Sequence, residues 1–116
     1  PMLLTMERRG ILVAFSIKTE KIKNNSEKSM FFKQLYGWTQ TVPKENKTYS
    51  YYREGVLDEM PHVKVHQSSF VIPEDNFDQI TDFFEEWSNK VIWRTFKVLL
   101  DRDIEKKFDE WEEEEE

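Results

Sequence analysis

Apolar and polar positions divide the chain into alternating strand-like and helix-like segments. Residues 9–18 and 91–100 are rich in β-branched and aromatic side chains, which is typical of strands. Residues 62–72 have the same character and end at Pro73, which cannot donate a hydrogen bond to a ladder. We therefore predict three core strands. The first contains a continuous apolar run, so it is expected to be buried on both faces.

Two helices are predicted between these strands. The first covers residues 25–36, and Asn25 or Ser26 can accept its free amide protons as the N-cap. Its inner face consists of three apolar residues, Met30, Phe31 and Leu35. The second starts at Glu74 or Asp75, and its apolar side chains recur at i, i+3, i+7 and i+10. This stripe consists of Phe77, Ile80, Phe84 and Trp87.

The remaining pattern indicates a hairpin and a terminal helix. Residues 38–42 and 47–53 are two extended runs, and Pro43 opens the polar break 43–46 between them. A proline at the start of a short polar break between extended runs is typical of a β-hairpin. Asp101 is expected to cap the terminal helix. The apolar side of that helix contains Ile104, Phe108 and Trp111.

The order of these elements predicts an α+β fold. With the hairpin counted as one strand and the terminal helix left out, the order is ferredoxin-like, βαββαβ, in which helices cover one face of an antiparallel sheet. We expect one ferredoxin-like domain over residues 1–100 with an extra hairpin, a C-terminal helix over residues 101–111 and a disordered acidic tail over residues 112–116. The strands are apolar enough that the other sheet face needs a cover as well. The terminal helix or a second copy would supply it, and we expect a homodimer.

Composition narrows the class of protein. A length of 116 residues is that of one domain, and the absence of cysteine excludes disulfides and cysteine-based metal sites. No apolar run approaches the roughly 18 residues that would span a bilayer. We therefore expect a cytoplasmic protein without membrane contact. The composition, rich in Lys and Glu and free of Cys, fits a thermophile. We expect an archaeal thermophile or one of its viruses as the source.

Charge is distributed unevenly along the chain. Residues 101–116 carry ten acidic and three basic residues, whereas the other hundred carry 13 acidic and 14 basic ones. The body is therefore almost neutral, and the sequence pI of ≈ 5.0 reflects the tail. This balance excludes both a strongly basic surface and a uniformly acidic one. The tail either keeps the protein soluble or imitates a run of phosphates toward a basic partner.

No group of residues has the spacing of a known catalytic or metal site. His62 and His66 are four residues apart, a spacing that chelates a metal on a helix. On a strand this spacing separates them by about 13 Å, and Pro61, Val63 and Val65 favour a strand. The three glycines are scattered, so no phosphate-binding loop is present. We therefore expect no catalytic residues, no metal, no cofactor and no enzyme activity.

Residues 67–72, Gln-Ser-Ser-Phe-Val-Ile, are followed by an acidic turn and an amphipathic helix. This stretch, about residues 67–88, resembles the third strand and second helix of Cas2-type proteins. The resemblance implies a ferredoxin-like fold and a dimer that binds duplex DNA. Some members of that family cleave nucleic acid with a metal ion held by an aspartate at the end of the first strand. Ser16, Lys18 and Thr19 occupy that region here, which argues against nuclease activity.

One part of the chain interleaves flat rings with cations. Within residues 38–66, rings can stack on bases while cations neutralise phosphates. The candidate nucleic-acid-binding residues are Trp38, Lys44, Lys47, Tyr49, Tyr51, Arg53, Lys64 and His66. The alternative is that Tyr and Trp are ordinary strand residues that pair across a hairpin. We expect a non-enzymatic domain that contacts DNA or RNA through the hairpin.

A different class of function stays open beside this one. A protein-interaction or inhibitor module would bind a host protein through exposed aromatic side chains or through the acidic tail. Third comes an enzyme, such as a metal-dependent nuclease, whose site is assembled across a dimer interface and so escapes detection in one chain.

Overall fold

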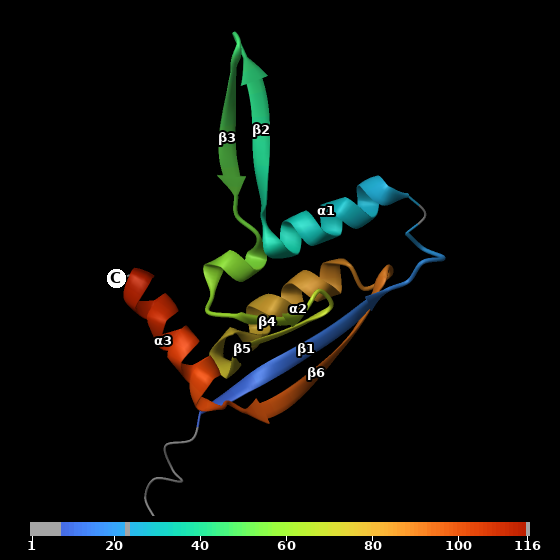
Figure 1. The fold of residues 1–116 in the computed structure, drawn as a ribbon. Helices are drawn as coiled ribbons and strands as arrows, with labels where there is room; N and C mark the ends of the chain where they lie inside the picture. Colours follow the sequence, from blue (N-terminus) through green and yellow to red (C-terminus); the bar gives the residue numbers. More distant parts are fainter. Residues whose placement is uncertain (1–7, 23, 116) are drawn as a thin grey trace, which may run out of the picture.

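The computed structural model describes residues 8–22 and 24–115, and a four-stranded antiparallel sheet lies at its centre (Figure 1). The strands lie side by side in the order β4-β5-β1-β6. Their bounds are Arg9–Ile17 for β1, Val63–His66 for β4, Ser69–Pro73 for β5 and Val91–Leu99 for β6. The two longest strands, β1 and β6, pair along their whole length, so they form the most extensive ladder of the sheet.

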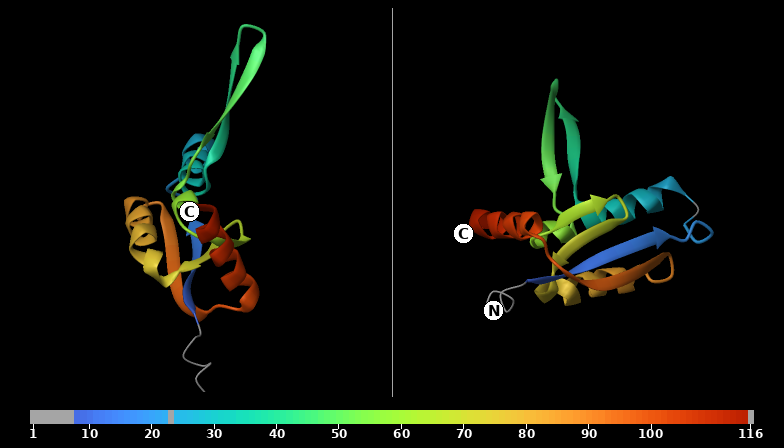
Figure 2. Two further views of the ribbon diagram at one scale, coloured as in Figure 1. Left: turned by 90° about the vertical axis from the view of Figure 1, so that its left-hand side faces the viewer. Right: turned by 60° about the horizontal axis from the view of Figure 1, so that its bottom comes forward.

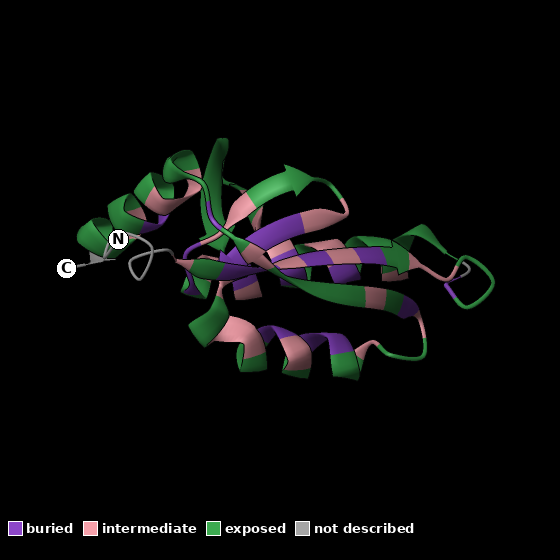
Figure 3. Ribbon diagram, turned by 90° about the horizontal axis from the view of Figure 1, so that it is seen from below, coloured by how far each residue is buried: buried purple, intermediate pink, exposed green. Residues whose placement is uncertain are grey.

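Helices α1 (Asn25–Tyr36) and α2 (Phe77–Glu86) cover one face of this sheet. Alternate residues of β1 point to that face, where Ile11, Val13 and Phe15 are buried against both helices. Figure 3 shows the buried positions gathered along the middle of the sheet and on the helix sides that face it. The predicted α+β class and the antiparallel sheet with covering helices are therefore confirmed.

The buried faces of the two helices differ in detail from the predicted ones. Phe31 of α1 is buried, but Met30 is 52% exposed because it lies on the neighbouring side of the helix. The N-cap is Asn24, whose side-chain oxygen accepts the Glu27 amide proton at 2.8 Å, one residue before the predicted position. In α2 the predicted stripe faces the core, and Phe83 is buried beside it.

Residues 62–72 form two strands, whereas a single strand was predicted. The chain turns at Gln67 and Ser68, so β4 folds back along β5, and the register shifts between Lys64 and His66. Polar residues in the middle of an otherwise apolar run favour such a turn. Without the hairpin, the order of elements is β1-α1-β4-β5-α2-β6, with short 3-10 turns at Val56–Glu59 and Glu74–Asn76.

The predicted extra hairpin is present and lies outside the central sheet. Strands β2 (Trp38–Lys44) and β3 (Lys47–Arg53) pair with each other and project away from the body (Figure 2). The turn consists of Glu45 and Asn46 alone, with φ of 51° and 71°, as in a type I′ turn. It is two residues shorter than the predicted break, because Pro43 and Lys44 belong to β2.

Helix α3 (Arg102–Glu115) packs on part of the second sheet face. The Asp101 carboxylate accepts the Ile104 amide proton at 2.9 Å, so the predicted cap is present. Phe108 is buried against Val71 and Leu100. The helix continues to Glu115, whereas a disordered tail was expected from residue 112. Among the described residues, no helix combines the length and the apolar character needed to cross a membrane.

Candidate nucleic-acid interface

The hairpin brings six of the predicted site residues together on one of its faces. Residues directly opposite each other in an antiparallel pair lie on the same face, and every second residue of a strand returns to it. The pairs on this face are Trp38 with Arg53, Gln40 with Tyr51, Val42 with Tyr49, and Lys44 with Lys47. We call these eight residues the basic–aromatic face. It contains three cations and three aromatic rings, and no acidic side chain.

The opposite face of the hairpin carries no charge. Its pairs are Thr39 with Tyr52, Thr41 with Ser50, and Pro43 with Thr48. We call these six residues the neutral face. Both strands are largely exposed, so burial against the body does not explain why the cations are confined to one side. The cations occupy every second position of the two strands, and this alternation places all three on one face.

A polar contact on the neutral face fixes the base of the hairpin to the body. The Tyr52 hydroxyl donates to the Asp58 carboxylate at 2.6 Å and lies 3.2 Å from the Tyr36 carbonyl oxygen. The same carboxylate accepts the Gly55 amide proton at 2.8 Å. The hydrogen bond to Asp58, together with partial desolvation and nearby negative charge, raises the pKa of Tyr52 to about 12. Tyr52 therefore serves as an anchor.

Two glycines form the neck, where the hairpin strands leave the body. Gly37 has a φ of +83°, and a side chain there would meet the Asp58 carboxylate at 2.6 Å. A side chain on Gly55 would overlap the Gly37 amide and come within 2.6 Å of the Leu35 carbonyl oxygen. Backbones approach this closely only without a Cβ atom. The neck therefore sets the direction of the hairpin.

Contacts within the basic–aromatic face order its inner half. The Lys33 ammonium of α1 lies 4.1 Å from the centre of the Trp38 ring, a cation–π contact. Arg53 donates through Nε to the Gln40 side-chain oxygen at 2.8 Å, and its guanidinium carbon is 5.7 Å from the Tyr51 ring centre. Toward the tip, Lys44 and Lys47 make no ion pair with any described residue. Two cations are thus available at the tip.

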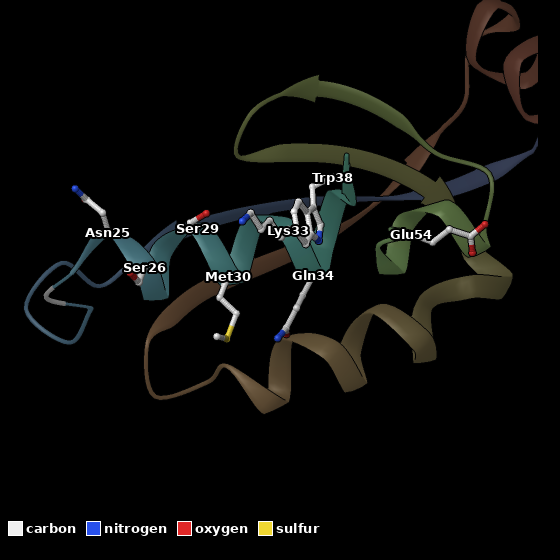
Figure 4. A pocket seen from close by; sticks show the side chains of 8 residues that line it. All are labelled: Asn25, Ser26, Ser29, Met30, Lys33, Gln34, Trp38 and Glu54. Carbon is white, nitrogen blue, oxygen red and sulfur yellow. The ribbon is translucent and has the colours of Figure 1, made fainter. Parts of the chain in front are cut away.

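A hollow of about 600 Å³ lies beside the neck, along the outer side of α1. Figure 4 shows Trp38 and Lys33 close together on its wall. Ser29 and Gln34 line it from α1, the helix that also carries Lys33. Glu54, the residue that follows β3, lines it as well. The hollow is open to solvent, and it extends the basic–aromatic face from the hairpin onto α1.

Lys64 and His66 do not belong to this face. The Lys64 ammonium lies 4.3 Å from the centre of the Tyr36 ring on the body of the protein. The Tyr36 hydroxyl donates to the Gln67 carbonyl oxygen at 2.6 Å, and burial raises the pKa of Tyr36 to about 12. His66 belongs to β4 and pairs with Ser69 of β5 in the central sheet, not with the hairpin. Both were grouped with the hairpin because they follow it closely in the sequence.

Three residues of this region were not predicted from the sequence. Gln40 and Val42 lie between Trp38 and Lys44 at every second position, so strict alternation would have placed them on the same face. Lys33 belongs to a helix, and nothing in the local pattern connects it with Trp38. Its place depends on how α1 meets the neck.

The two histidines lie at and just before an extended strand. His62 precedes β4, and its Nδ1 lies 3.1 Å from the Met60 carbonyl oxygen. His66 ends that extended strand, so the prediction of a strand rather than a helical turn is confirmed. Across the described ranges, no three His, Asp or Glu side chains are grouped closely enough to hold a metal ion.

Relatives provide no guide to this surface. The chain matches no protein-family model, no curated protein and no solved structure. The resemblance of residues 67–88 to Cas2-type proteins and the ferredoxin-like family name therefore stay predictions.

Proposed function

We propose that this chain is a small non-enzymatic domain that contacts nucleic acid, DNA or RNA, through the basic–aromatic face of its hairpin. The observation that carries the proposal is the sorting of side chains on a free-standing hairpin. Lys44, Lys47 and Arg53 all lie on one face, beside three aromatic rings, and the other face is neutral. Cations attract phosphates, and ring faces stack on bases.

Pairing across a hairpin does not require this arrangement. Cross-strand stabilisation places rings opposite β-branched side chains, as Val42 and Tyr49 are placed here. It also disfavours like charges directly opposite each other, and yet Lys44 is paired with Lys47 next to the turn. An anionic ligand at the tip would relieve this repulsion. The charge pattern therefore fits a binding surface better than a hairpin selected for stability alone.

The test is a binding titration with fluorescently labelled DNA and RNA at low and at moderate salt. Lys44→Gln/Lys47→Gln removes two cations from the basic–aromatic face. Thr41→Glu/Thr48→Glu changes the net charge by the same amount on the neutral face, so it is the matched control. We expect the first variant to lose most of its affinity and the second to lose little. Undetectable binding by the unaltered protein, or equal losses in the two variants, would refute the proposal.

We also propose that a second copy of the chain covers the open part of the second sheet face. Helix α3 covers one end of that face, around Val71. Beyond it, Ile92 and Phe96 of β6 are 46% and 51% exposed. Apolar side chains left in water on an uncovered sheet face favour association with another apolar surface. Self-association would present two hairpins to one ligand and so strengthen binding.

A further inference from the structure

The four tyrosines fall into two pairs with different surroundings. The hydroxyls of Tyr36 and Tyr52 are both hydrogen-bonded and hold the hairpin and α1 to the body. Tyr49 and Tyr51 lie on the basic–aromatic face and are 43% and 47% exposed. Their hydroxyls make no hydrogen bond to any described residue. The fold uses the hydroxyls of the first pair. The rings of the second pair are partly exposed and have neighbours on their own face, since the Arg53 guanidinium carbon lies 5.7 Å from the Tyr51 ring centre and Val42 stands opposite Tyr49.

Tyr49 and Tyr51 are two residues apart on one strand, so their rings leave the same face at points about 7 Å apart. The four residue pairs of this face together extend over about 20 Å. Lys44 and Lys47 lie at the tip end of this row, and Arg53 with Lys33 at the neck end. The row therefore has two ring platforms in the middle and cations at both ends.

This arrangement distinguishes between the two forms of nucleic acid. In a duplex the base faces are stacked on one another, and a protein meets phosphates and base edges. Two neighbouring ring platforms would have nothing to stack on. Gln40 and Arg53, two side-chain types that read base edges, are hydrogen-bonded to each other. In a single strand the base faces are free, and aromatic platforms beside cations are how proteins hold them.

We infer that the ligand of the basic–aromatic face is single-stranded nucleic acid, with two successive bases stacked on Tyr49 and Tyr51 and the backbone running between the cations of the tip and those of the neck. This inference rests on the proposed function and names its ligand class. Stacking on ring faces is tolerant of sequence, so the preference is for unpaired strands over a duplex rather than for one sequence.

The experiment compares a labelled homopyrimidine strand of about 12 nucleotides, as DNA and as RNA, with the duplex of the same sequence. Binding is measured by fluorescence anisotropy over a series of salt concentrations. Tyr49→Leu/Tyr51→Leu removes the rings but keeps apolar bulk. Tyr49→Phe/Tyr51→Phe restores the rings, and Ser50→Leu adds the same bulk to the neutral face between them. Circular dichroism establishes that each variant is folded.

We expect the unaltered protein to bind single strands about tenfold more tightly than the duplex. The Leu variant is expected to lose about tenfold or more on single strands, while the Phe and Ser50→Leu variants keep their affinity. Four phosphate contacts, one for each cation of the row, predict a slope of log K against log salt of about −3 on single strands. The Leu variant should keep that slope, because the rings do not neutralise phosphates.

Two failures can be told apart. If the duplex binds as tightly as the single strand, or if the Leu variant binds single strands normally, the inference is wrong while nucleic-acid binding through the hairpin stands. If neither form binds, the proposed function fails and this inference fails with it. Equal binding of DNA and RNA strands would support stacking and charge, whereas a strong preference for RNA would add a contact to the 2′-hydroxyl.

Discussion

Tyr52 has a different role from the two tyrosines on the other side of its strand. Its ring lies on the neutral face, and its hydroxyl reaches the Asp58 carboxylate, which also holds the Gly55 amide. One carboxylate thus connects the end of the hairpin to the turn that follows it. Since Gly37 and Gly55 allow the backbones to meet at this point, a small polar contact is enough to orient the hairpin.

This anchor predicts a loss of stability in alkali. The pKa of Tyr52 is raised to about 12 in the folded protein from 10.0, chiefly by its hydrogen bond to Asp58, and that of Tyr36 is raised to about 12 by burial. A hydroxyl whose pKa is raised on folding makes its full contribution to the free energy of unfolding below pH 10.0. This contribution is lost as the pH rises toward 12. Urea denaturation at pH 9, 10 and 11 is expected to show a falling midpoint.

Tyr52→Phe is the matched variant, because it keeps the ring and removes the titrating hydroxyl. Its midpoint should be lower at neutral pH and should fall less steeply above pH 10.0. Equal pH dependence in the two proteins would mean that Tyr52 does not donate to Asp58 in solution.

The hairpin as an element is held by its turn and neck rather than by a core. None of its residues is fully buried, and its polar alternation predicts a ribbon exposed on both sides. The sequence pattern was enough to place Trp38, Lys44, Lys47, Tyr49, Tyr51 and Arg53 on a hairpin. It was not enough to exclude Lys64 and His66, because the fold of the body decides where the next strand lies.

The turn of this hairpin can be improved. Glu45 adopts a φ of 51°, a left-handed conformation that costs a residue with a side chain about 1–2 kcal/mol. Asn-Gly is the preferred pair for a type I′ turn. Glu45→Asn/Asn46→Gly is therefore expected to slow amide hydrogen exchange in β2 and β3 several-fold.

The same variant removes an acidic side chain from the tip, so it should also bind nucleic acid more tightly. Glu45→Gln is the control, because it removes the charge and keeps the unfavourable turn. Exchange rates unchanged by the Asn-Gly turn would indicate that the neck, and not the turn, limits opening of the hairpin.

In the whole molecule, the two faces of the central sheet are covered unequally. One face is closed by α1 and α2, while α3 closes part of the other and leaves Ile92 and Phe96 exposed. We expect sedimentation velocity to detect a dimer at micromolar concentration. Phe96→Glu should shift the population to monomer without unfolding it, because that side chain is not part of the core. Phe77→Leu, a change on the covered face, should leave the dimer intact.

A monomer at every concentration tested would remove the second copy from the proposal and leave the hairpin untouched. A dimer that Phe96→Glu does not weaken would place the contact elsewhere, for example on the exposed edge of β4.

Local pattern by itself determined the character of each segment. The i, i+3, i+7 stripe of α2, the Asp101 cap and the alternation of the hairpin depend on neighbours within a few residues, so they can be read without a fold. Tertiary structure decided what depends on distant partners. It split residues 62–72 into two strands, set the hairpin outside the sheet, brought Lys33 to Trp38 and took His66 to another strand. These outcomes depend on which apolar surfaces meet, and no local pattern records that.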